Sequence, residues 1–258
     1  METRSVTPAG PPGTQSATGL AALKNVARFM TLVETLKSRG PYLPGLGVFN
    51  GPSGFGKTYA AIYAMNITRA PRLEVGDSWT KKKFLENLLR EVGVEPGRAS
   101  IADLTEMAIE ALADDFDRPL IIDEADKLVD KGMIELVREI YEHAQIPVVL
   151  IGEELLPQKL AKYERVHNRV LCWVQAEPCD LEDAAALAEL FCPELSLSED
   201  LLQLVIDKSG GRARRIAINL DQIARDVALS GNGPLLASSF NEDFFFTGEP
   251  PKRVRRAS

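Results

Sequence analysis

The sequence has little of what a metal centre, a disulfide framework or a membrane span requires. Its 258 residues include two histidines and three cysteines, and Cys172, Cys179 and Cys192 lack the C-x-x-C spacing of a zinc site. Such cysteines are expected to be buried, reduced thiols. No run approaches the roughly 18 apolar residues of a membrane helix, and the polar N-terminus has no signal-peptide pattern. We therefore expect a cytoplasmic protein with no membrane partner.

An excess of basic residues is also missing. The chain has 30 Lys and Arg against 37 Asp and Glu, a formal net charge of −7. This balance argues against a protein that coats nucleic acid indiscriminately, but it permits a local basic surface. Basic clusters do occur, as "KKK" at 81–83, "GGRARR" at 210–215 and "KRVRR" at 252–256.

One glycine-rich stretch carries a phosphate-binding pattern. The residues "GPSGFGKT" at 51–58 match G-x-x-x-x-G-K-[ST], between the apolar run "LGVFN" and a helix-forming segment. In such a loop the glycines let backbone N–H groups face phosphates, Lys57 neutralises phosphate oxygens, and the Thr58 hydroxyl is a Mg²⁺ ligand. We therefore predict a site for ATP and Mg²⁺, with binding residues Gly51, Pro52, Ser53, Gly54, Phe55, Gly56, Lys57 and Thr58.

An acidic pair supplies the second half of this site. In "PLIIDEAD" at 119–126, Asp123 follows an apolar strand and should emerge at the carboxyl edge of a parallel sheet, where ligands bind. There Asp123 can hold Mg²⁺ through water, and Glu124 can orient or deprotonate the attacking water. The same pair is also typical of the first turn of a helix. ATP hydrolysis is the interpretation that the upstream loop favours.

Short apolar strands alternate with helices over the first two thirds of the chain, which predicts an α/β fold with a parallel sheet covered on both faces. Strands are expected at 46–50, 72–75, 119–125, 146–152 and 170–175. Helices are expected at about 20–37, 57–67, 103–114, 132–144 and 155–163, and one more begins at Ser78 or Thr80 and ends at Gly93.

Strand signals vanish after about residue 178. Three helical patterns follow, "LEDAAALAELF", "SEDLLQLVIDKSGG" and "RARRIAINLDQIARDVALSG", and one further short helix is expected before the basic tail. We divide the chain into a disordered leader at 1–17, an α/β nucleotide-binding domain at 18–178, a small helical lid at 179–232 and a C-terminal segment at 233–258.

These features together resemble the AAA+ ATPase family, from about residue 20 to 230. The resemblance places Glu153, after the fourth strand, where the family usually carries an Asn, Ser or Thr called sensor 1. A carboxylate repels phosphate and donates no hydrogen bond unless it is protonated. Either Glu153 is not the sensor, or hydrolysis is slow and tuned.

The resemblance also assigns roles to arginines. Arg169 matches the arginine finger best, with Arg165 in reserve, although an exposed surface arginine is the alternative for either residue. Arg214 matches sensor 2 at the start of the last lid helix, whereas Arg212 and Arg215 are expected to be solvated. An arginine finger that reaches a neighbour's ATP implies a homo-oligomer, either a ring or a helical filament.

The segments "SWTKKKFLENLLREVG" and "LIGEELLPQKLAKYERVHNRV" are similar to those of transposition ATPases of the MuB and TnsC type. The resemblance implies an ATP-dependent filament on duplex DNA that selects a target site and activates a transposase. Thr80, Lys81, Lys82 and Lys83 would contact DNA phosphates without reading sequence. A solvated helix end is the other explanation for this lysine run.

Two other classes share this core. A secretion-type AAA+ ATPase would continue into a membrane segment, and a helicase loader would carry a helicase-binding element at its N-terminus. The helix-turn-helix appendage of the phage Mu protein has no counterpart in residues 1–45. We expect the protein in the cytoplasm of a bacterial host, where a phage- or transposon-encoded protein would also act.

Overall fold

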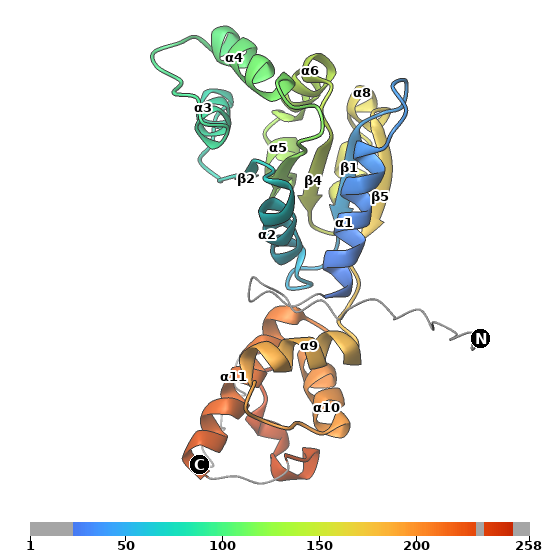
Figure 1. Cartoon of the computed structure of the whole chain (residues 1–258), viewed down its shortest axis with the longest axis vertical. Coiled ribbons are helices and arrows are strands. Elements are labelled where there is room, and N and C mark those ends of the chain that lie inside the picture. Colours follow the sequence, from blue (N-terminus) through green and yellow to red (C-terminus); the bar gives the residue numbers. More distant parts are fainter. Residues whose placement is uncertain (1–22, 231–234, 250–258) are drawn as a thin grey trace, which may run out of the picture.

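The computed structural model describes residues 23–230 and 235–249 of the chain. In Figure 1 a sheet domain lies above a smaller helical domain, and the carboxyl ends of the strands face the helical domain. The expected leader at 1–17 and the basic tail at 252–256 lie outside the described residues. No helix in the described ranges is both long enough and apolar enough to cross a membrane.

Five parallel strands form one sheet in the order β2-β3-β4-β1-β5. They are β1 (Leu46–Asn50), β2 (Arg72–Glu74), β3 (Leu120–Asp123), β4 (Val148–Gly152) and β5 (Val170–Gln175). Every residue of β1, β3 and β4 is buried, as expected of parallel strands with helices on both faces. The predicted α/β fold class is confirmed.

Helices cover both faces of this sheet. They are α1 (Lys24–Lys37), α2 (Lys57–Thr68), α3 (Lys81–Glu91), α4 (Ile101–Ala113), α5 (Asp126–Asp130), α6 (Ile134–Ala144), α7 (Leu156–Leu160) and α8 (Glu164–His167). One hydrophobic cluster packs α1 and α2 against one face of the sheet. A second cluster packs the helices from α3 through α7 against the other face. Thr80 is the N-cap of α3 and accepts the Lys83 N–H at 3.3 Å, so the choice between Ser78 and Thr80 is settled.

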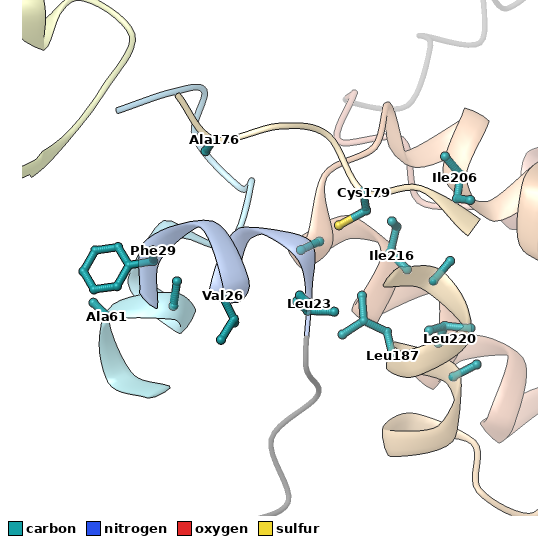
Figure 2. Close-up of a cluster of buried hydrophobic side chains, with 14 of the residues drawn as sticks. Leu23, Val26, Phe29, Ala61, Ala176, Cys179, Leu187, Ile206, Ile216 and Leu220 are labelled. Atoms are coloured by element: carbon teal, nitrogen blue, oxygen red, sulfur yellow. The ribbon is translucent and has the colours of Figure 1, made fainter. Parts of the chain in front are cut away.

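The helical domain consists of α9 (Leu181–Phe191), α10 (Glu199–Ser209) and α11 (Ala213–Ser230), close to the three predicted helices. Figure 2 shows that its core continues into the α1 layer, since Leu23 lies between Val26 on one side and Leu187 and Ile216 on the other. The helical domain is therefore packed against the sheet domain by the same hydrophobic cluster that covers α1 and α2.

The three cysteines are free thiols. Cys179 and Cys192 are buried, and burial raises the pKa of Cys179 to about 12 and that of Cys192 to about 11. Cys172 is only half-buried, so the expectation of burial was wrong for it. It lies on β5, which forms the edge of the sheet and is less completely covered.

Besides shifts of one to four residues at other ends, three elements differ from the prediction in ways that matter for the fold. β3 ends at Asp123, two residues early, because Glu124 has a left-handed backbone with φ of +59°, and α5 follows at once. The helix predicted at 155–163 ends early, as α7 at Leu160. An unpredicted short helix, α8, follows Tyr163, which leaves the helical conformation and donates its hydroxyl to Val129 O at 3.2 Å. The predicted C-terminal helix is two short 3₁₀ turns, η1 (Ala237–Ser239) and η2 (Glu242–Phe244).

Candidate functional site

The P-loop joins β1 to α2 and ends in two left-handed glycines. Gly54 and Gly56 have φ of +87° and +81°, values that a residue with a side chain rarely adopts. Gly56 is the N-cap of α2, and no side chain caps this helix start. An uncapped helix N-terminus presents N–H groups and a partial positive charge, so a phosphate can serve as its cap.

Lys57 is held against the loop that precedes it. Its Nζ donates to Gly51 O at 2.5 Å and to Pro52 O at 2.9 Å. Burial lowers the pKa of Lys57, and the charges of nearby carboxylates, with Glu153 and Asp123 first, partly oppose that effect. The ammonium group is thus a partly desolvated cation within reach of a bound phosphate.

A cavity of about 350 Å³ lies between the P-loop, the ends of β3 and β4, and the helical domain. Its polar wall includes Gly56, Lys57, Thr58, Asp123, Glu124, Glu153 and Arg214. Its apolar wall includes Leu23, Tyr59, Ile62, Leu187, Leu190 and Phe191. A lining that combines charged and apolar side chains suits a molecule that carries both phosphates and a flat ring.

Asp123 has a partner that the sequence analysis missed. Arg72 on β2 donates from Nη2 to Asp123 Oδ2 at 2.7 Å and to Glu74 Oε2 at 3.0 Å. Asp123 is 3% exposed. Burial lowers the pKa of Arg72, but hydrogen bonds and attraction from the two carboxylates outweigh it, so the net shift is upward. An arginine therefore neutralises the carboxylate that was predicted to hold Mg²⁺.

Glu124 lines the cavity and is 43% exposed, with an ion pair to Lys127 at 3.5 Å. Its left-handed backbone is an uncommon conformation for a residue with a side chain, and such strained residues concentrate at functional sites. With this backbone geometry, the Glu124 side chain lies at the edge of the cavity, directly after the buried Asp123. The position suits a residue that polarises a water beside a phosphate.

Glu153 is positioned by a second residue that the sequence analysis did not single out. Buried Asp126 accepts the Glu153 N–H at 2.7 Å and pairs with Lys159 at 3.3 Å. Gly152 leaves room for Asp126, because a Cβ there would collide with the Asp126 carboxylate and with Leu156. The exposed Glu153 side chain thus stands opposite Lys57, at the predicted sensor 1 position.

Arg212 and Arg214 both contact the P-loop from the helical domain. Arg214 lines the cavity, and its N–H donates to Gly54 O at 3.3 Å. Arg212 donates from Nη1 to Ser53 O at 3.1 Å, and its guanidinium lies 5.8 Å from the centre of the Phe55 ring. The expectation that Arg212 is solvated was therefore wrong.

Arg215 is half-buried too, with its guanidinium packed against Gly248 of the C-terminal segment.

The candidate arginine fingers lie elsewhere, and neither lines the cavity of its own chain. Arg169 pairs through Nε and Nη2 with Glu142 Oε1, both at 3.0 Å. Arg165 on α8 is exposed, and among the described residues it has no ion pair. The finger assignment stays a prediction, with Arg165 the freer of the two side chains.

The three lysines at the start of α3 are exposed, but their surroundings differ. Lys81 lines a groove of about 840 Å³ beside carboxylates of α4 and α6, among them Glu106 and Glu139. Lys82 and Lys83 do not line it. An anionic ligand is therefore better placed to contact Lys82 and Lys83 than Lys81.

The protein offers few Mg²⁺ ligands of its own. The described residues contain no group of three or more His, Cys, Asp or Glu side chains that could hold a metal. Thr58 and Asp123 line the same cavity, and a hydroxyl and a carboxylate are oxygen ligands of the kind that Mg²⁺ takes beside phosphates. Such an ion would lower the negative charge of the phosphates beside Glu124 and Glu153.

The fold and the loop are those of P-loop proteins of the α/β class. Residues 42–160 match the family model described as "AAA domain", which is less than half of the chain. The predicted AAA-type core is thereby confirmed, whereas the transposition type is not. No curated protein matched the sequence significantly.

Solved structures with the same fold include several AAA+ proteins. Orc1 of Aeropyrum pernix in complex with DNA is 18% identical, with a TM-score of 0.60 over 84% of this chain and 63% of that one. Cdc6p of Pyrobaculum aerophilum is 17% identical (TM-score 0.59, 89% and 66%). The RuvB Holliday junction branch migration motor of Thermotoga maritima is also 17% identical (TM-score 0.57, 87% and 67%). The chain spans slightly less than two thirds of the first two proteins.

The Arg72–Asp123 pair generates a test of the metal position. Arg72→Ala leaves a buried carboxylate without its cation, so we expect a loss of about 3–5 kcal/mol in unfolding free energy. Mg²⁺ with ADP returns a cation to Asp123, so it should stabilise this variant more than the unaltered chain. Urea unfolding with and without Mg²⁺ and ADP measures both effects.

Glu74→Ala is the matched control for this variant, because Glu74 is the other, 62% exposed partner of Arg72. Its loss should cost less than about 1 kcal/mol. Equal stabilisation of Arg72→Ala and the unaltered chain by Mg²⁺ and ADP would contradict a metal position at Asp123.

The lowered pKa of Lys57 generates a test by pH. Because the unfolded chain holds this proton more tightly, the unaltered protein gains stability as pH rises toward 10.5. Lys57→Met lacks this contribution. The free energy of unfolding of the variant minus that of the unaltered chain should therefore fall between about pH 7 and about pH 10. Urea unfolding over this range measures the difference, and a constant or rising difference would refute a desolvated lysine.

Proposed function

We propose that this chain is an ATPase that binds Mg²⁺ and ATP, assembles on duplex DNA as a homo-oligomer and acts in DNA transposition with a transposase. The observation that carries the nucleotide part is one cavity in which Lys57, Asp123, Glu124 and Arg214 meet. The four residues come from three segments of the chain, the start of α2, the end of β3 and the start of α11, and each has the chemistry that phosphoryl transfer needs.

The chain's own residues divide the work as follows. The P-loop N–H groups and Lys57 bind phosphates, and Thr58 with Asp123 hold the ion, which would neutralise charge on the leaving phosphates. Glu124 accepts a hydrogen bond from the attacking water and orients it. Glu153 faces the same phosphates with a negative charge, which weakens binding of the terminal phosphate and favours slow turnover.

Two observations support DNA as a partner. Lys82 and Lys83 are exposed on the first turn of α3, where they can contact phosphates without reading bases. Proteins with this fold include Orc1 of Aeropyrum pernix in complex with DNA and a Drosophila ORC bound to DNA (15% identity, TM-score 0.53). The transposition role and a bacterial cytoplasmic location rest on the resemblance of the α3 and α7–α8 segments to transposition ATPases.

The two candidate arginine fingers support the proposal of a homo-oligomer. Arg165 and Arg169 lie outside their own cavity, so either can act on nucleotide only across an interface between subunits. Such an interface is head to tail, and it produces a ring or a helical filament.

The first experiment is duplex DNA binding, followed by fluorescence anisotropy with Mg²⁺ and ATP, with ADP and without nucleotide. We expect tight binding only with ATP, and negative-stain images of rings or filaments on the DNA. Lys57→Ala should lose nucleotide and DNA binding together. Glu124→Gln should keep both and lose hydrolysis. DNA binding that ignores nucleotide would refute the transposition proposal and favour a protein client.

The double variant Lys82→Ala/Lys83→Ala tests the DNA contact. If each lysine neutralises one phosphate, the slope of log K against log salt concentration should become shallower by roughly 1.8. Affinity for ADP should not change, because neither residue lines the nucleotide cavity.

Two single variants serve as controls. Lys81→Ala should have a smaller effect, since Lys81 faces glutamates. Arg225→Ala, at a 78% exposed arginine on α11, should have none. An unchanged slope in the double variant would remove α3 from the DNA interface.

A further inference from the structure

The carbonyl oxygens of residues 53–55 all accept hydrogen bonds from outside the P-loop. From the helical domain, Arg212 Nη1 donates to Ser53 O at 3.1 Å, and the Arg214 N–H donates to Gly54 O at 3.3 Å. The third accepts from Nδ2 of Asn25 on α1 at 2.8 Å. The N–H and C=O groups of a trans peptide point in opposite directions. The Asn25 bond therefore turns the Gly56 N–H away from α1, and Gly56 lines the nucleotide cavity.

The same amide also binds the linker, residues 176–180, which connects β5 to α9. Asn25 Nδ2 donates to Glu177 O at 2.7 Å, and Oδ1 accepts the Glu177 N–H at 3.0 Å. Asn25 is 3% exposed. Both donor hydrogens and the acceptor oxygen of one buried side chain are thus divided between the P-loop and the linker.

Neighbouring residues of α1 hold the same segment. The Lys24 N–H donates to Asp183 Oδ1 at 2.7 Å, and Asp183 is the third residue of α9 and part of its capping box. Arg28 pairs with the Glu177 carboxylate at 2.7 Å. The N-cap residue of α1, Leu23, provides no side-chain hydrogen bond to the start of this helix. The start of α1 is therefore fixed to the linker and to the first turn of the helical domain.

We propose that Asn25 is a positioning residue that links nucleotide binding in the P-loop to the orientation of the helical domain. If nucleotide moves the peptide between Phe55 and Gly56, the linker must follow, or Asn25 must leave a buried polar group unpaired. An unpaired buried group is costly, so the two movements are coupled. By reciprocity, the position of the linker sets the affinity of the loop for phosphate.

This link differs from that of Arg214, because it reaches the linker and not α11. The inference rests on the nucleotide-binding part of the proposed function, and it needs neither DNA nor hydrolysis. ADP is therefore a sufficient probe.

The test is hydrogen exchange of the full chain with and without saturating Mg²⁺ and ADP, read by mass spectrometry. In the unaltered chain, ADP should slow exchange in the P-loop and also in residues 176–183. In Asn25→Ala, saturating ADP should still protect the P-loop, but protection of 176–183 should be lost. Calorimetric titration should show roughly a tenfold weaker affinity for ADP.

Thr31→Ala is the matched control, because Thr31 is an exposed residue of the same helix whose hydroxyl donates to Ala27 O. It should behave like the unaltered chain in both measurements. Asn25→Asp is a second variant of the same size. It keeps an acceptor for the Glu177 N–H, loses both donors, and should lose linker protection as Asn25→Ala does.

The outcomes separate the two proposals. If ADP protects neither the P-loop nor the linker of the unaltered chain, the proposed function fails. If ADP protects only the P-loop of the unaltered chain, or if Asn25→Ala keeps protection of 176–183, the coupling through Asn25 is refuted. The result that ADP protects only the P-loop needs no variant. The inference can therefore be refuted even if Asn25→Ala folds poorly.

Discussion

The site depends on the hydrogen bonds that the backbone carbonyl groups of the P-loop accept. A phosphate can bind backbone N–H groups only if the carbonyls of the same peptides face elsewhere, and each buried carbonyl then needs its own donor. Lys57 supplies donors for Gly51 and Pro52 from within the motif. For residues 53–55 the donors come from α1 and from the start of α11. The loop is therefore completed by segments far away in sequence.

Apolar contacts also bind the helical domain closely to the sheet domain. One hydrophobic cluster includes Leu23 and Val26 on α1, Ala61 on α2 and Ile216 on α11 (Figure 2). That cluster spans both domains, so a large rotation of the helical domain would expose apolar surface to water. Such exposure costs roughly 25 cal/mol of free energy per Å². Nucleotide-driven movements at this junction should thus be small adjustments of hydrogen bonds rather than a wide opening.

The sequence predicts the elements well where the signal is local. The glycines and Lys57 of the P-loop have a fixed spacing, and the apolar run before Asp123 identifies a buried strand whose end must face the same edge. Arg72, Asn25 and Asp126 could not be predicted in the same way, because their partners lie 51, 30 and 27 residues away. A buried Asn or Arg in sequence carries no indication of its partner, and only packing reveals it.

Charge pairing in the site has a consequence for the order of events. Three carboxylates at or near the cavity each pair with a different cation: Asp123 with Arg72, Glu124 with Lys127, and Asp126 with Lys159. Nucleotide phosphates bring negative charge, and their metal ion brings a competing cation to the first of these pairs. Breaking a buried ion pair is costly unless a replacement charge arrives at once. Metal and phosphate should therefore enter together. The partly exposed Glu124–Lys127 pair can rearrange at least cost, which frees Glu124 to contact water.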